Sequence, residues 1–541
     1  MQYYEDLREF VGYLEQLGKL HRWRRPINKD TELMALHRCQ FRGLPAEERK
    51  VFLFEQVTDA RGRAFSMKVL AGAYAVSGQV MALGMGCQNW EELKEKWHYA
   101  LEHPVDPVLV DSGPVQEEVH VGRELQEIGL DELPVPVEEP GFAGTVRVCA
   151  PFITRDSETG IRNVGMYSGH LRAKDRLIAG IARIQHAMLY HWSDARRRKQ
   201  GLPVAIVLGT TPDLVFAASA SIPYGVDELA VAGGIAGRPI PLVRCKTIPL
   251  EVPAMAEIVI EGELSTEVLE PYTAFGDYPG YMDIERSSVP VIKVTAITHR
   301  HDAIFNPILV GFPPSENSAI SRMLNEITLF HFLRYSCNLP MVEEVHWPEA
   351  AGGLNWCVIR MKKLHPSQSW QVLRLAAGAC PLGKIFIAVD EDVDPKDPDL
   401  VTWAVSFAMQ PHRDVEVITG RVPGLDPSGL LLAHREGGRE SYPGLQGCSS
   451  ILIDATRKGA YPPVALPKKE HMETAIRIWK EEEGLPNLNL ASPWYGYDLG
   501  QWSEDDRENA ELIARGMYLK LGEKMAQRQT PVGDEAGEAG F

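Results

Sequence analysis

The stretch Asn163-Val164-Gly165-Met166-Tyr167 carries the first of three polar side chains on which the interpretation of this chain depends. The second stands in Ile184-Gln185-His186 and the third in Asp227-Glu228-Leu229-Ala230. An amide oxygen, an imidazole nitrogen and a carboxylate together suit a hard to borderline divalent ion such as Mn²⁺ or Mg²⁺. We therefore predict that Asn163, His186 and Glu228 bind one divalent ion. Taken alone, a histidine on an apolar segment also fits a core residue, so the prediction depends on all three.

The composition narrows the class of protein. The chain has 541 residues, 45% of them hydrophobic, and a formal net charge of −17. Such an acidic chain is a poor partner for nucleic acid or an anionic membrane, because both require basic surface. No apolar run approaches the roughly 18–20 residues of a membrane span, and the N-terminus has no signal-peptide pattern. Eight cysteines without a C-x-x-C motif are typical of reduced thiols, so we expect a cytoplasmic enzyme.

Apolar periodicity predicts a mixed α/β chain. Residues 3–20 and 314–338 have helical spacing, and an alanine-rich helical stretch lies within 212–237. Strands are expected at 51–54, 204–208 and 289–297. An alternation that indicates an α/β layer follows, with strands at 356–361, 384–389 and 414–418, and helices at 370–377, 401–409, 470–482 and 505–526.

The segments around the three predicted metal ligands, together with further motifs, resemble those of the UbiD family of prenylated-FMN-dependent decarboxylases. The further motifs are Tyr4-Glu5-Asp6-Leu7-Arg8, Phe275-Gly276-Asp277-Tyr278-Pro279-Gly280-Tyr281 and Ile453-Asp454-Ala455-Thr456. The resemblance implies an α/β (α+β) fold with a split β-barrel in the N-terminal cofactor domain, a long connecting helix and a C-terminal α/β oligomerisation domain. The boundaries that we predict are 1–313 for the prenylated-FMN and metal-binding domain, 314–338 for the connecting helix, 339–465 for the α/β oligomerisation domain, 466–528 for C-terminal helices and 529–541 for a disordered tail.

The resemblance also implies the cofactors. Prenylated FMN would be bridged through its phosphate to a divalent ion (Mn, Fe or Mg) on Asn163, His186 and Glu228. A second ion, K⁺, would be held by Glu228 and by the backbone carbonyls of Val164, Ala217, Ala218 and Ala220. Close helix packing is the other explanation for these alanines. The residues that flank the metal ligands, and that we expect at the cofactor, are Gly165, Met166, Tyr167 and Gln185.

Asp277 stands where the family places the acid that protonates the carbon left when CO₂ departs, a task that suits a carboxyl group in a low-dielectric pocket. A turn residue before Pro279 and Gly280 is the alternative. Two neighbours depart from the family pattern, because Ser168 replaces the usual Arg and Tyr272 the usual Glu. We expect the carboxylate–arginine–carboxylate network to lack its cation here. Glu270 could take the role of the missing Glu, and the segment 299–301 (His-Arg-His) could supply a charge or be exposed loop.

These residues predict a non-oxidative decarboxylase. Our best substrate hypothesis is an aromatic acyl-CoA with a free ring carboxylate, because the chain looks most like the phthaloyl-CoA decarboxylase type. A free aromatic or heteroaromatic acid, decarboxylated or formed by carboxylation, is the alternative. A non-catalytic flavin-binding homologue or subunit is the hypothesis of another class.

The basic residues 196–199, and Arg22, Arg24 and Arg25, fit either a solvated surface or contacts with CoA phosphates. We expect a flavin prenyltransferase to supply the cofactor, and a homodimer or homohexamer.

Overall fold

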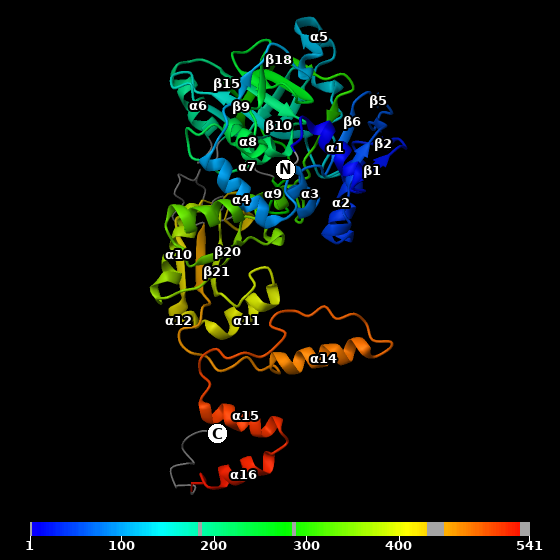
Figure 1. Cartoon of the computed structure of the whole chain (residues 1–541). Coiled ribbons are helices and arrows are strands. Elements are labelled where there is room, and N and C mark those ends of the chain that lie inside the picture. Colours follow the sequence, from blue (N-terminus) through cyan, green and yellow to red (C-terminus); the bar gives the residue numbers. More distant parts are fainter. Residues whose placement is uncertain (1–2, 182–186, 284–287, 423, 430–447, 531–541) are drawn as a thin grey trace. The chain divides into compact units, whose positions relative to one another are not determined.

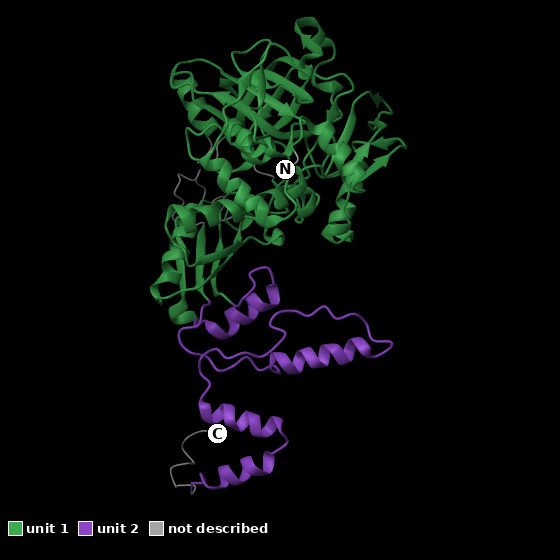
Figure 2. Cartoon of the chain, viewed as in Figure 1, with its two compact units in different colours: residues 1–391, 411–454 green, residues 392–410, 455–541 purple. Residues whose placement is uncertain are grey.

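The computed structural model describes residues 3–181, 187–283, 288–422, 424–429 and 448–530. The chain divides into two compact units, one of Met1–Glu391 with Pro411–Asp454 and one of Asp392–Gln410 with Ala455–Phe541 (Figure 2). Every functional residue discussed below lies in the first unit.

The first unit contains a closed β-barrel (Figure 1). Its sheet runs in the order β11-β10-β9-β12-β15-β18-β8, and β11 also pairs with β18, with Leu177 opposite Ile292. That second pairing closes the sheet on itself, which confirms the predicted barrel. The strands are β8 (Glu118–Val121), β9 (Arg147–Arg155), β10 (Arg162–Ala173), β11 (Arg176–Ala179), β12 (Leu202–Leu208), β15 (Ile258–Pro271) and β18 (Ser288–His299).

Helices cover the outside of this barrel, which explains why β12 is apolar on both faces: Val204–Leu208 is buried throughout. Helix α7 (Pro212–Ser219) begins with proline at its first turn and packs on β9, β10 and α8. Helix α8 (Glu228–Ala236) is capped by Asp227, whose Oδ1 accepts from the Leu229 amide at 2.9 Å. Further helices of this part are α1 (Leu7–Gln16), α2 (Leu33–Gly43), α3 (Gly78–Gly84), α4 (Trp90–Glu102), α5 (Gly122–Glu127) and α6 (Ala187–Arg197).

Smaller sheets surround the barrel. One has the order β1-β3-β6-β19, from Leu20–Trp23, Val51–Phe54, Lys68–Ala71 and Ile304–Phe305. The others are β2-β4-β5 (Ile27–Asn28, Val57–Thr58, Ala64–Phe65), β14-β13-β7 (Glu251–Pro253, Pro241–Arg244, Val108–Leu109) and the hairpin β16-β17 (Phe275–Gly276, Met282–Asp283). The short helix η3 (Gly129–Glu132) lies between α5 and β9 in the sequence.

Helix α9 (Glu316–His331) begins at Ser315 with a capping box and continues into a π-helical turn, η4 (Phe332–Ser336). It leads to a five-stranded sheet in the order β20-β21-β22-β24-β23, whose three central strands are parallel. Helix α10 (Ser367–Ala379) covers this sheet, and α12 (Pro411–Asp414) precedes its edge strand β23. The strands are Val342–His346, Trp356–Met361, Ile385–Asp390, Ser449–Asp454 and Val415–Thr419.

The second unit contains α11 (Pro398–Ala408), α14 (Lys469–Glu481), α15 (Glu504–Ala514) and α16 (Tyr518–Ala526). The single helix expected over 505–526 is instead two helices, because Gly516 between them adopts φ +72°. Most of the predicted tail, residues 531–541, lies outside the described residues. Among the helices that the structure describes, none is long and apolar enough to cross a membrane.

Candidate active site

The pairing of β9 with β10 distributes the predicted site residues over two faces of the same ribbon. Ser168 is opposite Cys149 and His170 is opposite Arg147, so these four side chains share a face. By the same alternation, Val164 and Met166 belong to that face. Asn163, Gly165 and Tyr167 belong to the other. We refer to these as the Ser168 face and the Asn163 face.

Of the predicted metal ligands, Glu228 lies beside the strand that carries Asn163. The amide of Val164 donates to Glu228 Oε2 at 3.0 Å, which places that carboxylate beside the residue that follows Asn163. Asn163 is buried, and its side chain is hydrogen-bonded to the Tyr167 side chain. Its Nδ2 has no hydrogen-bond partner among the described residues.

Burial raises the pKa of Glu228 to about 7, with a smaller opposing effect from Arg162. The Arg162 guanidinium donates to Asp227 at 2.7 Å and to Glu251 at 3.3 Å. The desolvated carboxylate beside a buried amide group therefore fits a bound divalent cation, which would supply the missing positive charge. Gln185 and His186 lie outside the described residues, so their part in this site stays a prediction.

The residues predicted for K⁺ lie on β10, on α7 and directly after α7, and α7 packs against both β10 and α8. Ala217 and Ala218 are buried near the end of α7, and Ala220 directly follows that helix. Helix α7 packs on β10, which carries Val164, and on α8, which begins at Glu228. The carbonyls of Ala217 and Ala220 each accept a backbone amide, which agrees with ordinary chain packing, so the potassium site also stays a prediction.

Asp277 lies in the turn between β16 and β17. Its carbonyl accepts from Gly280 at 2.9 Å and its Oδ1 from the Tyr278 amide at 2.6 Å. Asp277 is therefore a turn residue, as the alternative interpretation predicted. This does not exclude a catalytic role, because a buried guanidinium bonds the carbonyl of the preceding residue, Gly276.

That guanidinium belongs to Arg147, on β9. Its side chain is 4% exposed and its Nη2 donates to Glu138 Oε2 and to the carbonyl of Gly276, both at 2.6 Å. Burial opposes its charge, but Glu138 and, to a smaller extent, Asp277 outweigh this and raise the pKa of Arg147 above its ordinary value. A buried cation that the sequence interpretation did not include therefore bonds Glu138 and the carbonyl of the residue before Asp277.

Ser168 lies on the same face of the ribbon as Arg147. Its side chain is hydrogen-bonded to Cys149, and burial raises the pKa of that thiol to about 11. Next to it, the His170 ring lies 4.9 Å from the Tyr272 ring and 4.7 Å from Phe275. Burial, assisted by Arg147, lowers the pKa of His170 to about 3, so this imidazole is neutral.

The other substitutes considered for the missing groups have different partners. Glu270 pairs with Arg176 at 3.0 Å and lies 3.8 Å from Arg172. Arg300 bonds Asp6 at 2.7 Å, and His301 contacts Glu118 at 2.8 Å. The signal for Arg147 was a lone charge inside an apolar strand, Val146-Arg147-Val148, and only strand pairing reveals that it neighbours Ser168.

Glu139 is a second carboxyl group at the same turn. Its Oε2 accepts from the Gly276 amide at 3.3 Å, while its Oε1 is buried without a hydrogen-bond partner among the described residues. Burial, and then the charge of Glu138, raise the pKa of Glu139 to about 7. Because Gly276 directly precedes Asp277, this group is an alternative proton donor that sequence reasoning missed.

Comparisons with known proteins agree with this architecture. The chain matches the N-terminal, Rift-related and C-terminal domains of 3-octaprenyl-4-hydroxybenzoate carboxy-lyase (UbiD) over residues 11–97, 108–313 and 318–455. An uncharacterised protein of Aquifex aeolicus is 32% identical over 451 residues, which is 78% of this chain and 88% of the relative.

Two solved structures are also similar. One is an evolved dimeric form of the UbiD-class enzyme HmfF from Pelotomaculum thermopropionicum in complex with prFMN, at 28% identity and a TM-score of 0.73, covering 86% of this chain and 98% of that one. The other is vanillic acid decarboxylase from Sedimentibacter hydroxybenzoicus in closed form, at 26% identity and a TM-score of 0.75, covering 89% of this chain and 100% of that one.

Proposed function

Because this chain belongs to the UbiD family of carboxy-lyases, we propose that it removes CO₂ non-oxidatively from an aromatic carboxylic acid with prenylated FMN as cofactor. The observation that carries the proposal is the buried guanidinium of Arg147, which bonds both Glu138 and the carbonyl of Gly276, the residue before Asp277.

The Asn163 face is the proposed cofactor side. Asn163, His186 and Glu228 would hold Mn, Fe or Mg, and K⁺ would be held by Glu228 with the carbonyls of Val164, Ala217, Ala218 and Ala220. Gly165 and Tyr167 of this face, together with Gln185 and with Met166 of the Ser168 face, would contact the flavin. When bound, prenylated FMN supplies an electron sink for the carbanion that decarboxylation leaves.

The Ser168 face is the proposed proton-transfer side. The carboxyl of Asp277 would give its proton to the carbon that CO₂ leaves, and it becomes a carboxylate in that step. Arg147 stabilises this carboxylate because it is held in place beforehand, by Glu138 and the Gly276 carbonyl, in a site that excludes most water. Ser168 and Tyr272 would shape the space next to this pair.

For the substrate, the geometry favours a free aromatic acid. The buried guanidinium of Arg147 lies on the same face of the ribbon as Ser168, so an activating thioester is not needed to compensate for an absent cation. Two of the basic residues considered for CoA phosphates also have acidic partners: Arg22 bonds Glu15 and Glu55, and Arg198 bonds Glu158. The aromatic acyl-CoA with a free ring carboxylate remains the second candidate, favoured by the small side chain of Ser168.

The test uses the full chain co-produced with a flavin prenyltransferase. Purified protein is incubated in deuterium oxide with matched free aromatic acids and their CoA thioesters, and products are followed by mass spectrometry. We expect deuterium at the vacated ring carbon of a free acid. Turnover of thioesters alone would select the second candidate. A flavin-loaded protein that turns over neither series would overturn the enzymatic proposal and favour a non-catalytic homologue, and light scattering would decide between the proposed homodimer and homohexamer.

A further inference from the structure

Three metal-ligating side chains meet on a part of the barrel that the proposed reaction does not use. His120 lies on β8, Glu132 ends η3 and His299 ends β18. In the antiparallel pair β8–β18, His120 is opposite Ile297, so His299 lies diagonally across on the same face. The three side chains are 14%, 16% and 12% exposed, so they are largely desolvated but still open to a small ion.

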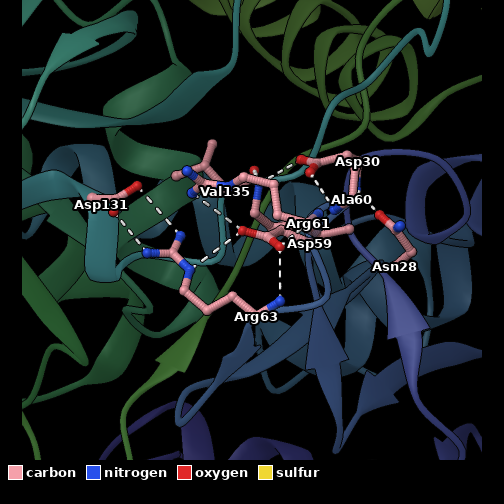
Figure 3. A network of polar contacts seen from close by, with 9 residues as sticks. Asn28, Asp30, Asp59, Ala60, Arg61, Arg63, Asp131 and Val135 are labelled. Atoms are coloured by element: carbon pink, nitrogen blue, oxygen red, sulfur yellow. Dashed lines mark hydrogen bonds and ion pairs between the residues drawn. The ribbon is translucent and has the colours of Figure 1, made fainter.

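The segment that carries Glu132 is fixed from both sides. Gly129 has φ +57°, and a Cβ there would lie 2.5 Å from the carbonyl of Lys174, which accepts from the Leu130 amide at 2.7 Å. Next to Glu132, Asp131 accepts from Arg63 at 2.7 Å, within the polar network of Figure 3. These contacts on both sides hold the Glu132 carboxylate beside the two imidazoles.

Only one of the three distances among the ligand atoms, that between the two imidazole nitrogens, is short enough for a hydrogen bond. His120 Nε2 and His299 Nε2 are 3.2 Å apart, and Glu132 Oε2 lies 3.6 Å from the first and 3.8 Å from the second. Both nitrogen–oxygen distances are too long for hydrogen bonds. Ligand atoms on a tetrahedral Zn²⁺ with bonds of about 2.0–2.1 Å stand about 3.3–3.4 Å apart, whereas adjacent ligands of an octahedral ion stand closer, at about 3.0 Å.

The hydrogen bond of His299 fixes the tautomer that can bind a metal ion through Nε2. Its Nδ1 lies 2.9 Å from the carbonyl of Arg300, which can only accept, so Nδ1 carries the proton and Nε2 presents its lone pair to the cluster. His120 Nδ1 has no hydrogen-bond partner among the described residues, and Glu124 Oε2 lies 3.9 Å from it. The surrounding carboxylates, Glu118 and Glu124, give a local field that attracts a cation.

We propose that His120, Glu132 and His299 form a Zn²⁺ site with water as the fourth ligand, separate from the divalent site proposed on Asn163, His186 and Glu228. The ion would join η3 to the strands β8 and β18, which already pair with each other in the sheet. Two imidazoles and one carboxylate are a recurrent zinc ligand set.

The test measures zinc in the full chain after treatment with a chelator and titration with ZnCl₂. All variants carry Glu228→Gln, so that the other divalent site is weakened. We expect one Zn²⁺ per chain in this background, at least tenfold weaker binding in His299→Ala and in Glu132→Gln, and no change in His471→Ala, which removes an exposed histidine. Glu132→Gln preserves the side-chain shape, so it keeps the test valid if His299→Ala fails to fold.

The coordination is checked by X-ray absorption at the zinc edge and by substitution with Co²⁺. We expect two nitrogen and two oxygen neighbours at about 2.0–2.1 Å and the intense visible bands of tetrahedral Co²⁺. Zinc binding that is equal in the Glu228→Gln protein and in its Glu132→Gln derivative would overturn the proposal. A six-coordinate spectrum would overturn the assignment to zinc.

Discussion

The carboxylates at the two faces of the β9–β10 ribbon differ in their bonding partners. On the Ser168 face, Glu138 is bonded to a buried guanidinium, and the chain supplies its own counter-charge. On the Asn163 face, Glu228 is desolvated and accepts from a backbone amide, while the neighbouring Arg162 donates to Asp227 and Glu251. A carboxylate without a bonded cation is what an external ion requires, whereas a satisfied pair is what a fixed electrostatic environment requires.

Because of this difference, the two faces should respond differently to mutation. Removing a charge from the Ser168 face leaves its partner buried and alone, so stability and activity should fall together. Removing the charge of Glu228 removes a desolvated carboxylate from the cofactor-free protein, so its stability should not fall. Only the binding of the ion and the cofactor should become weaker. The following predictions test this contrast, from the largest expected effect to the smallest.

The largest effect is expected from Asp277→Asn. Without a proton to donate, the product should form about 10²–10⁴-fold more slowly, while the amount of bound flavin stays near that of the unmodified protein. The measurement is deuterium incorporation into product, together with the flavin absorption of the purified protein. Glu139→Gln is the matched control, and a larger loss in that variant would transfer the role of proton donor to Glu139.

Arg147→Ala should destabilise the protein by about 3–5 kcal/mol, because Glu138 would be left buried without its cation. The double variant Arg147→Met/Glu138→Leu removes both charges and should recover most of this loss in denaturant unfolding. It should not recover turnover if the guanidinium stabilises the Asp277 carboxylate. Recovery of kcat in the double variant would show that the pair serves packing alone.

Glu228→Gln should weaken retention of the divalent ion and of the flavin by about tenfold or more, because an anionic ligand is lost. In the cofactor-free protein the same variant should unfold at unchanged or slightly higher denaturant concentration. Flavin and metal content after gel filtration, compared with denaturant melts of the cofactor-free protein, measure the two effects. A large loss of stability without cofactor would contradict the contrast between the faces.

The smallest effect is a pH dependence from Glu139, whose pKa of about 7 exceeds its ordinary value of 4.5. A raised carboxyl pKa means that the folded state holds its proton more tightly, so this group's contribution to stability falls as the pH rises from about 4.5 to about 7. The groups around it are Glu138, Arg147, Arg38 and the Gly276 amide. Glu139→Gln should therefore stabilise the protein by about 1–3 kcal/mol at pH 8 and by little at pH 4. Equal effects at both pH values would show that the carboxyl is not perturbed.

The fold was predictable where a local pattern carries the information. The apolar run 356–361 is strand β21, and the helical spacing predicted over 314–338 corresponds to helix α9 and the π-helical turn after it. The break at Gly516 was missed, because helical periodicity continues on both sides of it. Glycine is permissive, so its effect depends on context that a single sequence does not show.

The site divides in the same manner. Asn163, Glu228 and Asp277 lie in recognisable motifs, and the structure places Glu228 beside Val164, the residue that follows Asn163. Arg147, Glu138 and Glu139 lie in segments without such words, and their relation to Asp277 depends on the pairing of β9 with β10 and on the β16–β17 turn. In the cluster of His120, Glu132 and His299, the first two residues are near each other in sequence, but His299 is remote, and only the pairing of β8 with β18 brings it to them.

The closure of the barrel has a consequence for synthesis of the chain. Strand β11 finishes at Ala179, but its second partner, β18, runs from Ser288 to His299. At translation rates of about 5–20 residues per second, the ribosome needs roughly 5–25 s to reach that partner. During this interval the nascent sheet has an open apolar edge, which is the kind of surface that pairs with other chains. Expression at lower temperature or with added chaperones should therefore raise the yield of this protein more than that of proteins whose sheets close locally.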